Sequence, residues 1–504
     1  MSTAPGSPPP DSLFGTGPRG IFRRTLPTAE HEPEHRMVRA IGLGRLTLIG
    51  IGAIIGAGIF TLAGSVAHDT AGPAVLVSFL VAGLASVCAA FCYAEFAGFV
   101  PRAGSSYTYG ASVLGEIVGW IIGWDLLLEY TAIVAVVSIG MSGYVDYLLH
   151  SAHINLPLWM QGAPGTGTGH YVDLIAMVIC VGVAWLLNQG TKRSTRVDAI
   201  LTIVKIAVVL LVVIVGLFKV HGSNLTPFAP FGWGGAMTGA ATVFFAVFGY
   251  DALSTAAEES IEAKRHLPKA MIISLAVSML LYVLACIVLT GMVNYKDINP
   301  TSGFSSAFQS VGLGGIGDII AIGAVLGIVT VCFSFMMGAS RMWYAMSRDG
   351  LMPAWFGRLH PRRRVPTRAT WVLGGASAVL AGLLPVNDAA ELVNIGVLLA
   401  FVVVCAAVVV LRYRRPDLPR GFKVPWMPVV PIVGIGFSIW LTTFLTSVTW
   451  WRFVIWLVVG LIVYSAYGYR KTRQVMPGGS VSLDDLQRLG QAEEEAEPPA
   501  PAAT

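Results

Sequence analysis

The chain has 504 residues, of which 55% are hydrophobic and only 12% are charged, and its formal net charge is +5. Soluble domains carry about 25% charged residues, so this composition excludes an ordinary soluble protein and predicts an integral membrane protein. The six cysteines all lie within apolar runs, and no CxxC, HExxH or Walker pattern occurs. These absences argue against a disulfide framework, a zinc site and a phosphate-binding loop.

Polar tails flank the apolar region. Residues 1–37 are rich in Pro, Gly and Ser, and residues 474–504 end in the acidic run Glu-Glu-Glu-Ala-Glu followed by prolines. Neither tail can bury enough apolar surface to fold, so we expect both to be disordered. The N-terminus also lacks a basic stretch followed by an apolar one, so we expect no cleavable signal peptide.

Between the tails, apolar stretches long enough to cross about 30 Å of hydrocarbon predict an all-α protein with twelve transmembrane helices. The third and eighth stretches are longer than a bilayer requires, which predicts tilt or extension beyond it. The predicted spans are 45–67, 73–100, 113–149, 172–188, 197–219, 234–260, 269–293, 315–347, 369–385, 389–412, 428–447 and 451–470.

The distribution of lysine and arginine predicts the orientation. With both termini inside, all but four of the 33 basic residues fall on the cytoplasmic side; the exceptions are Lys205, Lys219, Lys296 and Arg452. Lys205 lies within the fifth span, and the other three lie on the outer side. By the positive-inside rule we expect both termini in the cytoplasm and a multi-pass protein of the plasma membrane.

Two of the predicted spans are interrupted. Residues 50–60 read GIGAIIGAGIF, and residues 244–252 read FFAVFGYDA, with a glycine beside an acid. Backbone groups that leave a helix at membrane depth are tolerated only where they line a cavity, and paired broken helices indicate the substrate site of a secondary transporter. Close helix packing is the alternative explanation for the glycines of the first span.

The breaks suit an amino acid, which carries a carboxylate and an ammonium on one carbon. The amides of Gly56, Ala57 and Gly58 are predicted to donate to the carboxylate from the start of a half-helix, where the dipole is favourable. The ammonium needs acceptors, for which we predict the carbonyls of Phe245, Ala246 and Phe248, together with that of Ile54. These residues form the predicted substrate-binding backbone.

Three of the ionisable residues inside the predicted spans are candidates for the site; gating or structural ion pairs are expected instead for those nearer span ends, Glu95, Asp125, Glu258 and Glu259. Lys205 is about eight residues into the fifth span, where an unpaired ammonium is costly. We predict a titrating group that contacts the unwound part of the first span and couples transport to protons; snorkelling to the cytoplasmic surface is the alternative. Glu129 and Asp251 are predicted to lie at the site, with helix-packing hydrogen bonds as the alternative.

The sequence resembles a known family. The chain, over about residues 37–470, is similar to the amino acid–polyamine–organocation superfamily, and within it to bacterial members of the cationic amino acid transporter family. The motifs that carry the resemblance are, in chain order, GAIIGAGIF (52–60), YAEF (93–96), PRAGSSYTY (101–109), GWDLLLEY (123–130), VKI (204–206), PFGW (230–233), FFAVFGYD (244–251), STAAEE (254–259) and SRDGLMP (347–353).

The resemblance implies a LeuT-like core of two inverted five-helix repeats, with broken helices 1 and 6 and two further helices. The implied divisions are a cytoplasmic N-tail (1–37), a first repeat (38–220), a second repeat (221–415), two outer helices (416–473) and a cytoplasmic C-tail (474–504). It also implies that Lys205 couples transport to protons in bacterial members and that Glu129 and Asp251 match acids of the site region. The family places a specificity residue on the eighth span near residues 332–335, for which we predict Ser334.

We therefore expect a proton-coupled amino acid permease, not an enzyme, with no cofactor beyond the proton. The substrate is predicted to be arginine or lysine, or a broad range of neutral L-amino acids. An exchanger, a polyamine carrier and, in another class, a non-transporting amino acid sensor remain alternatives. The expected partners are the substrate and the lipid bilayer, with no nucleic acid; a small membrane subunit and a homo-oligomer both stay open.

Overall fold

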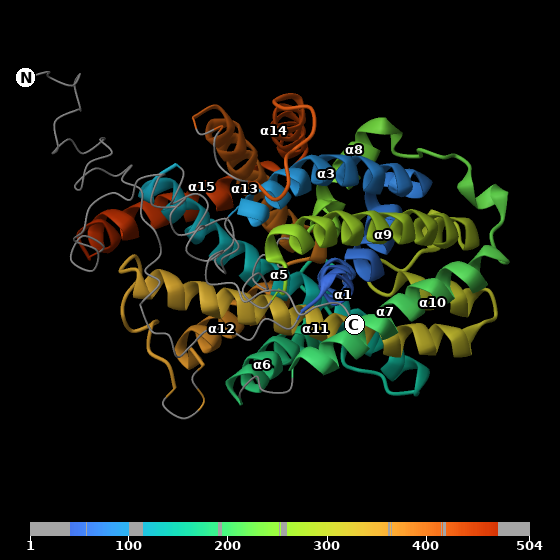
Figure 1. The fold of residues 1–504 in the computed structure, drawn as a ribbon. Helices are drawn as coiled ribbons and strands as arrows, with labels where there is room; N and C mark the ends of the chain where they lie inside the picture. The colour runs from blue at the N-terminus through green and yellow to red at the C-terminus, as the bar shows by residue number, and fades with distance from the viewer. Residues whose placement is uncertain are drawn as a thin grey trace, which may run out of the picture.

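The computed structural model describes residues 41–56, 58–99, 114–189, 194–250, 253, 260–360, 363, 365–414, 416 and 420–471. Within these ranges every named element is a helix, as the composition predicts, and the only β contacts are two isolated bridges, Ile41 to Ser260 and Gln161 to Asp173. The helices form one bundle, with α1 and α5 near its middle and with α14 and α6 at opposite edges (Figure 1).

The first half of the bundle begins with an interrupted helix and continues with long apolar ones. Its elements are α1 (Leu43–Ile54), η2 (Gly58–Leu62), α2 (Ala63–Val66), η3 (Ala67–Ala71), η4 (Gly72–Ala74), α3 (Val75–Phe99), α5 (Glu116–Ser151), η5 (Leu158–Met160), α6 (Leu174–Asn188) and α7 (Ser194–Leu217). Together η2, α2 and η3 continue the first predicted span beyond its break.

The second half also begins with an interrupted helix. Its elements are η6 (Gly222–Leu225), α8 (Gly232–Val243), η7 (Phe244–Val247), α9 (Ala263–Met292), η9 (Tyr295–Asp297), α10 (Gly303–Ser310), α11 (Gly314–Arg348), α12 (Thr367–Leu383), α13 (Val386–Arg414), α14 (Val429–Thr442), α15 (Ser447–Val463) and η10 (Tyr464–Gly468). A helix overlaps each of the twelve predicted spans.

Seven helical stretches among the described residues are long and apolar enough to cross a membrane. One of them, Leu43–Phe96, runs through the first two predicted spans, and three shorter apolar helices accompany the seven: Leu174–Asn188, Gly232–Val247 and Val429–Thr442. The third and eighth predicted spans are the longest helices, α5 with 36 residues and α11 with 35. Their length agrees with the sequence, in which both apolar runs exceed what a bilayer needs.

Helix α5 is the central helix and α15 a peripheral one. The most apolar window of α5 is 89% buried, whereas that of residues 447–471 is 22% buried. Tryptophans attach the outer helix to the inner one: Trp124 donates to the carbonyl of Trp456 at 2.8 Å, and Trp456 donates back to the carbonyl of Trp124 at 3.1 Å. Their rings are stacked 4.5 Å apart. The six cysteines are free and buried, as their apolar surroundings predict.

Candidate functional site

The first break lies where the glycine run predicts it. Helix α1 ends at Ile54, Ile55 takes an extended conformation with φ −71° and ψ 107°, and the helix resumes at Gly58. Of the predicted carboxylate donors, Gly56 and Gly58 lie at this break, and residue 57 lies outside the described part of the chain. The amides at the start of η2 are therefore those of a new helix, the end that favours an anion.

The second break follows η7. Phe248 is extended, with φ −94° and ψ 172°, and Gly249 has φ +115°, a conformation that side chains other than hydrogen rarely allow. A Cβ on Gly249 would lie 2.8 Å from the carbonyl oxygen of Ala53. The glycine thus permits the chain both to turn and to approach the first broken helix.

The two breaks meet. A Cβ on Gly58 would lie 2.5 Å from the Cα of Ala246, so the two backbones touch at this point. Gly58 has no positive φ, which makes close approach the reason for glycine here. Of the two explanations that the sequence leaves open for this position, backbone contact between two broken helices combines both: the glycine packs closely, and it does so at the breaks.

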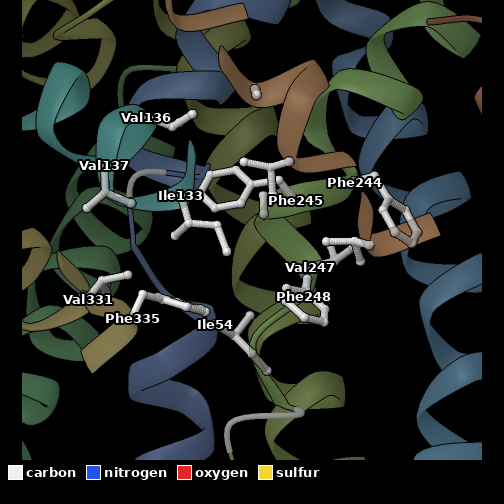
Figure 2. Packing of buried hydrophobic residues seen from close by; sticks show 14 of the residues in the cluster. Ile54, Ile133, Val136, Val137, Phe244, Phe245, Val247, Phe248, Val331 and Phe335 are labelled. Atoms are coloured by element: carbon white, nitrogen blue, oxygen red, sulfur yellow. The ribbon is translucent and has the colours of Figure 1, made fainter. Parts of the chain in front are cut away.

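A small pocket, with room for about one water molecule in this conformation, lies at this meeting point. Figure 2 shows Ile54, Phe248 and Phe335 close to one another, with Val331 nearby and the Phe245 ring above them. The side chains of the described lining residues are all apolar, so the polar groups that these residues offer are those of the backbone. The lining residues are Ala53, Ile54, Gly56, Gly58, Phe245, Phe248, Val331 and Phe335.

Side chains from other helices donate hydrogen bonds to the carbonyls freed in the first break. Lys205 of α7 donates from Nζ to the carbonyls of Gly52 at 2.8 Å and Ile55 at 3.2 Å, and is 1% exposed. The lysine therefore points into the unwound segment and not toward the surface. Gly327 of α11 makes room for it, since a Cβ there would lie 3.0 Å from Cδ of Lys205.

Two tyrosines complete this arrangement, and sequence reasoning missed both. Tyr282 of α9 donates to the carbonyl of Ile54 at 2.8 Å, and Tyr144 of α5 donates to that of Phe60 at 2.6 Å. The Ile54 carbonyl, expected to be open to the substrate ammonium, already accepts the Tyr282 hydroxyl in this conformation. A tyrosine in an apolar helix gives no signal of a backbone partner 84 or 228 residues away in the chain.

The remaining predicted residues lie around the cavity or outside the description. Glu129 is fully buried on α5, and Ala246 is buried against Gly58, but neither is among the lining residues. Ser334 is half-buried on α11, where Val331 and Phe335 face the cavity in its place. Asp251 lies outside the described residues.

Asp125, for which the sequence favoured a gating or structural ion pair, lies deep in the bundle. Asp125 of α5 is 1% exposed, and neither carboxylate oxygen has a hydrogen-bond partner within the described structure. It packs against α13, where a Cβ on Gly396 would lie 2.7 Å from Oδ1. Asp125 stands one helical turn before Glu129 on the same face of α5.

Sequence comparisons find a matching family and similar proteins. The profile of a family described as "Amino acid permease" matches residues 41–465. The branched-chain amino acid permease BcaP of Bacillus subtilis (strain 168) is 45% identical over 443 residues, which cover 87% of this chain and 95% of that protein.

Two further relatives carry other names. The methylthioribose transporter of Bacillus subtilis (strain 168) is 43% identical over 431 residues, covering 86% of this chain and 94% of that protein. The vacuolar cationic amino acid transporter 4 of Arabidopsis thaliana is 35% identical over 394 residues, covering 77% of this chain and 66% of that protein. The names agree on transport and differ on what is transported.

Proposed function

The chain belongs to the amino acid permease family, and on that premise we propose that it carries an L-amino acid with a small or branched apolar side chain across the cell membrane. The observation that carries the proposal is the apolar cavity at the meeting point of two broken helices. The amides at the start of η2 suit the carboxylate, and the carbonyls that end η7 suit the ammonium.

The proposed architecture is the LeuT-like one, with twelve spans, two inverted five-helix repeats and two outer helices. The support is that the breaks fall in the first and sixth predicted spans, the first helix of each repeat. Paired broken helices in corresponding positions are typical of such transporters. The basic residues of the loops support a cytoplasmic location for both termini.

The lining of the cavity favours an apolar side chain over a cationic one. Phe245, Phe248, Val331 and Phe335 supply contact area, and no described lining residue is charged. A guanidinium or ammonium desolvated among them would cost several kcal/mol unless a carboxylate paired with it. The 45% identity to a protein named as a branched-chain amino acid permease points the same way.

The same lining argues against the other substrates. The ring hydroxyls of methylthioribose would need several hydrogen-bond partners, and the described lining offers none from side chains. A polyamine has no carboxylate for the amides at the start of η2. An amino acid uses both sets of freed backbone groups.

Proton coupling through Lys205 is part of the proposal. Its ammonium joins two carbonyls of the unwound segment at 2.8 and 3.2 Å, the arrangement of a bound cation. Loss of its proton removes the charge that the two carbonyls attract, and frees them. The first broken helix can then change position.

Uptake by purified protein in liposomes tests the proposal. We expect leucine, isoleucine and valine to accumulate when the outside is more acidic, and arginine to be taken up far more slowly. A preference for arginine or for methylthioribose would overturn the apolar side-chain assignment. Equal accumulation with and without a pH gradient would overturn proton coupling. Binding without any uptake would favour a sensor.

A further inference from the structure

A buried asparagine of α13 contacts the backbone just before the second break. Asn394 is fully buried, and its Nδ2 donates to two consecutive carbonyls of α8, those of Ala241 at 2.7 Å and Thr242 at 2.9 Å. The two bonds join the tenth predicted span to the sixth. Asn394 is not among the residues that line the pocket, so it can affect the site only through the backbone that it holds.

The two carbonyls need donors because the helix changes its type just after them. In a continuous α-helix they would accept from the amides four residues further on, those of Phe245 and Ala246. Helix α8 ends at Val243, however, and η7 follows it as a 3₁₀-helix, which pairs each amide with the carbonyl three residues before it. A buried carbonyl without a donor is costly at membrane depth, so the bonds from Asn394 stabilise the change of helix type.

The partners of the Asn394 amide determine its orientation. A carbonyl can only accept, so the atom that faces Ala241 and Thr242 must be the nitrogen; turning the amide over would place oxygen against oxygen. The nitrogen carries two hydrogens, one for each carbonyl. Asn394 Oδ1 has no hydrogen-bond partner within the described structure. The two donated bonds therefore hold this side chain, and they are what a substitution would remove.

A phenylalanine on the same face of α13 packs across the break. Phe401 lies about two turns after Asn394 and is fully buried. The centroid of its ring lies 5.4 Å from that of Phe244, 5.8 Å from that of Phe248 and 6.1 Å from that of Tyr250. Phe244 begins η7, and Phe248 lines the pocket. Helix α13 thus holds the second break by hydrogen bonds before it and by ring contacts across it.

We propose that Asn394 is a positioning residue for substrate binding: by holding the end of α8, it sets the place of the η7 carbonyls that we assign to the substrate ammonium. The inference rests on the proposed substrate site, which takes an amino acid between the two breaks. The role of Asn394 differs from that of Lys205 at the first break, because a side-chain amide does not titrate and protonation cannot break its bonds. The second break therefore keeps its shape when the first is released.

The first test measures the break itself, without substrate. Hydrogen–deuterium exchange of the purified protein, read by mass spectrometry, reports how often backbone hydrogen bonds open. Asn394→Leu keeps a branched side chain and loses both donors, so exchange in residues 243–250 should become about tenfold faster. Exchange in residues 54–60, at the first break, should not change. Asn188→Leu is the matched control and should alter neither stretch, since Asn188 is also buried and its Nδ2 donates at 2.9 Å to Ala184 of its own helix.

The second test measures the binding of leucine by isothermal titration. Asn394→Leu should bind leucine about tenfold more weakly than the unaltered protein, because the carbonyls of the break no longer keep their places. Asn394→Asp keeps the shape of the side chain, and a carboxyl buried there is held neutral, with one hydrogen in place of two. Its affinity should fall between those of the unaltered protein and Asn394→Leu. Asn188→Leu should bind leucine as the unaltered protein does.

Three results would overturn the proposal. One is unchanged exchange at residues 243–250 in Asn394→Leu, or in Asn394→Asp if Asn394→Leu does not fold. Another is equally faster exchange at both breaks, which would make Asn394 a general packing residue. The third is a leucine affinity of Asn394→Asp equal to that of the unaltered protein. A failed substrate proposal would show differently: the unaltered protein itself would not bind leucine, and the exchange measurements would still decide whether Asn394 holds the break.

Discussion

Adding a single methyl group at Gly58 should weaken substrate binding sharply. The Cβ of alanine would lie 2.5 Å from the Cα of Ala246, whereas ordinary contacts begin near 3.4 Å, so the two broken helices must part by about 1 Å. Overpacking of this kind costs about 1–3 kcal/mol, which corresponds to roughly a five- to hundredfold loss of affinity. The loss should appear in binding, because the parting occurs at the cavity.

Isothermal titration of purified Gly58→Ala with the preferred amino acid measures the effect. Gly375→Ala is the matched control, since a Cβ there meets nothing within 4 Å and lies in helix α12. Adding Ala246→Gly to Gly58→Ala should restore part of the affinity, as it removes one of the two atoms in conflict. Unchanged affinity in a Gly58→Ala protein that elutes as a single species would refute the reasoning.

Further predictions concern coupling, recognition and stability. Lys205→Ala should lose accumulation driven by a pH gradient while still binding substrate; gradient-driven uptake equal to that of the unaltered protein would contradict the coupling proposal. Leucine should compete for the site, whereas its amine and its carboxylic acid analogues should bind roughly five- to hundredfold more weakly, because each leaves buried groups unpaired at about 1–3 kcal/mol. Asp125→Ala should leave the melting temperature unchanged or raised, since its buried oxygens have no partner among the described residues. Glu391→Ala, which strands two threonine hydroxyls, should lower it; the opposite order would refute the comparison.

The breaks were predictable from sequence because their cause is local. Gly249 allows its own positive φ, the glycine run around Gly56 and Gly58 is visible in the sequence, and a lone lysine in an apolar span is a recognisable signal. The facing residues were not predictable. Which of Val331, Ser334 and Phe335 meets the cavity depends on the rotation of α11 within the bundle, which packing sets. Tyr282 offered no pattern at all, since its partner is a backbone carbonyl of another helix.

The side chains that donate hydrogen bonds to the unwound carbonyls also affect how the protein behaves when no substrate is bound. Lys205, Tyr282 and Tyr144 come from three different helices: the first two donate to carbonyls at the first break, and the third donates to the carbonyl of Phe60 just beyond it, in η2. A gap in a helix would otherwise leave these oxygens bare at membrane depth, at a cost of several kcal/mol. Because these carbonyl oxygens already accept hydrogen bonds, the segment needs no bound substrate to stay folded. We therefore expect the substrate-free protein to reorient without binding substrate first.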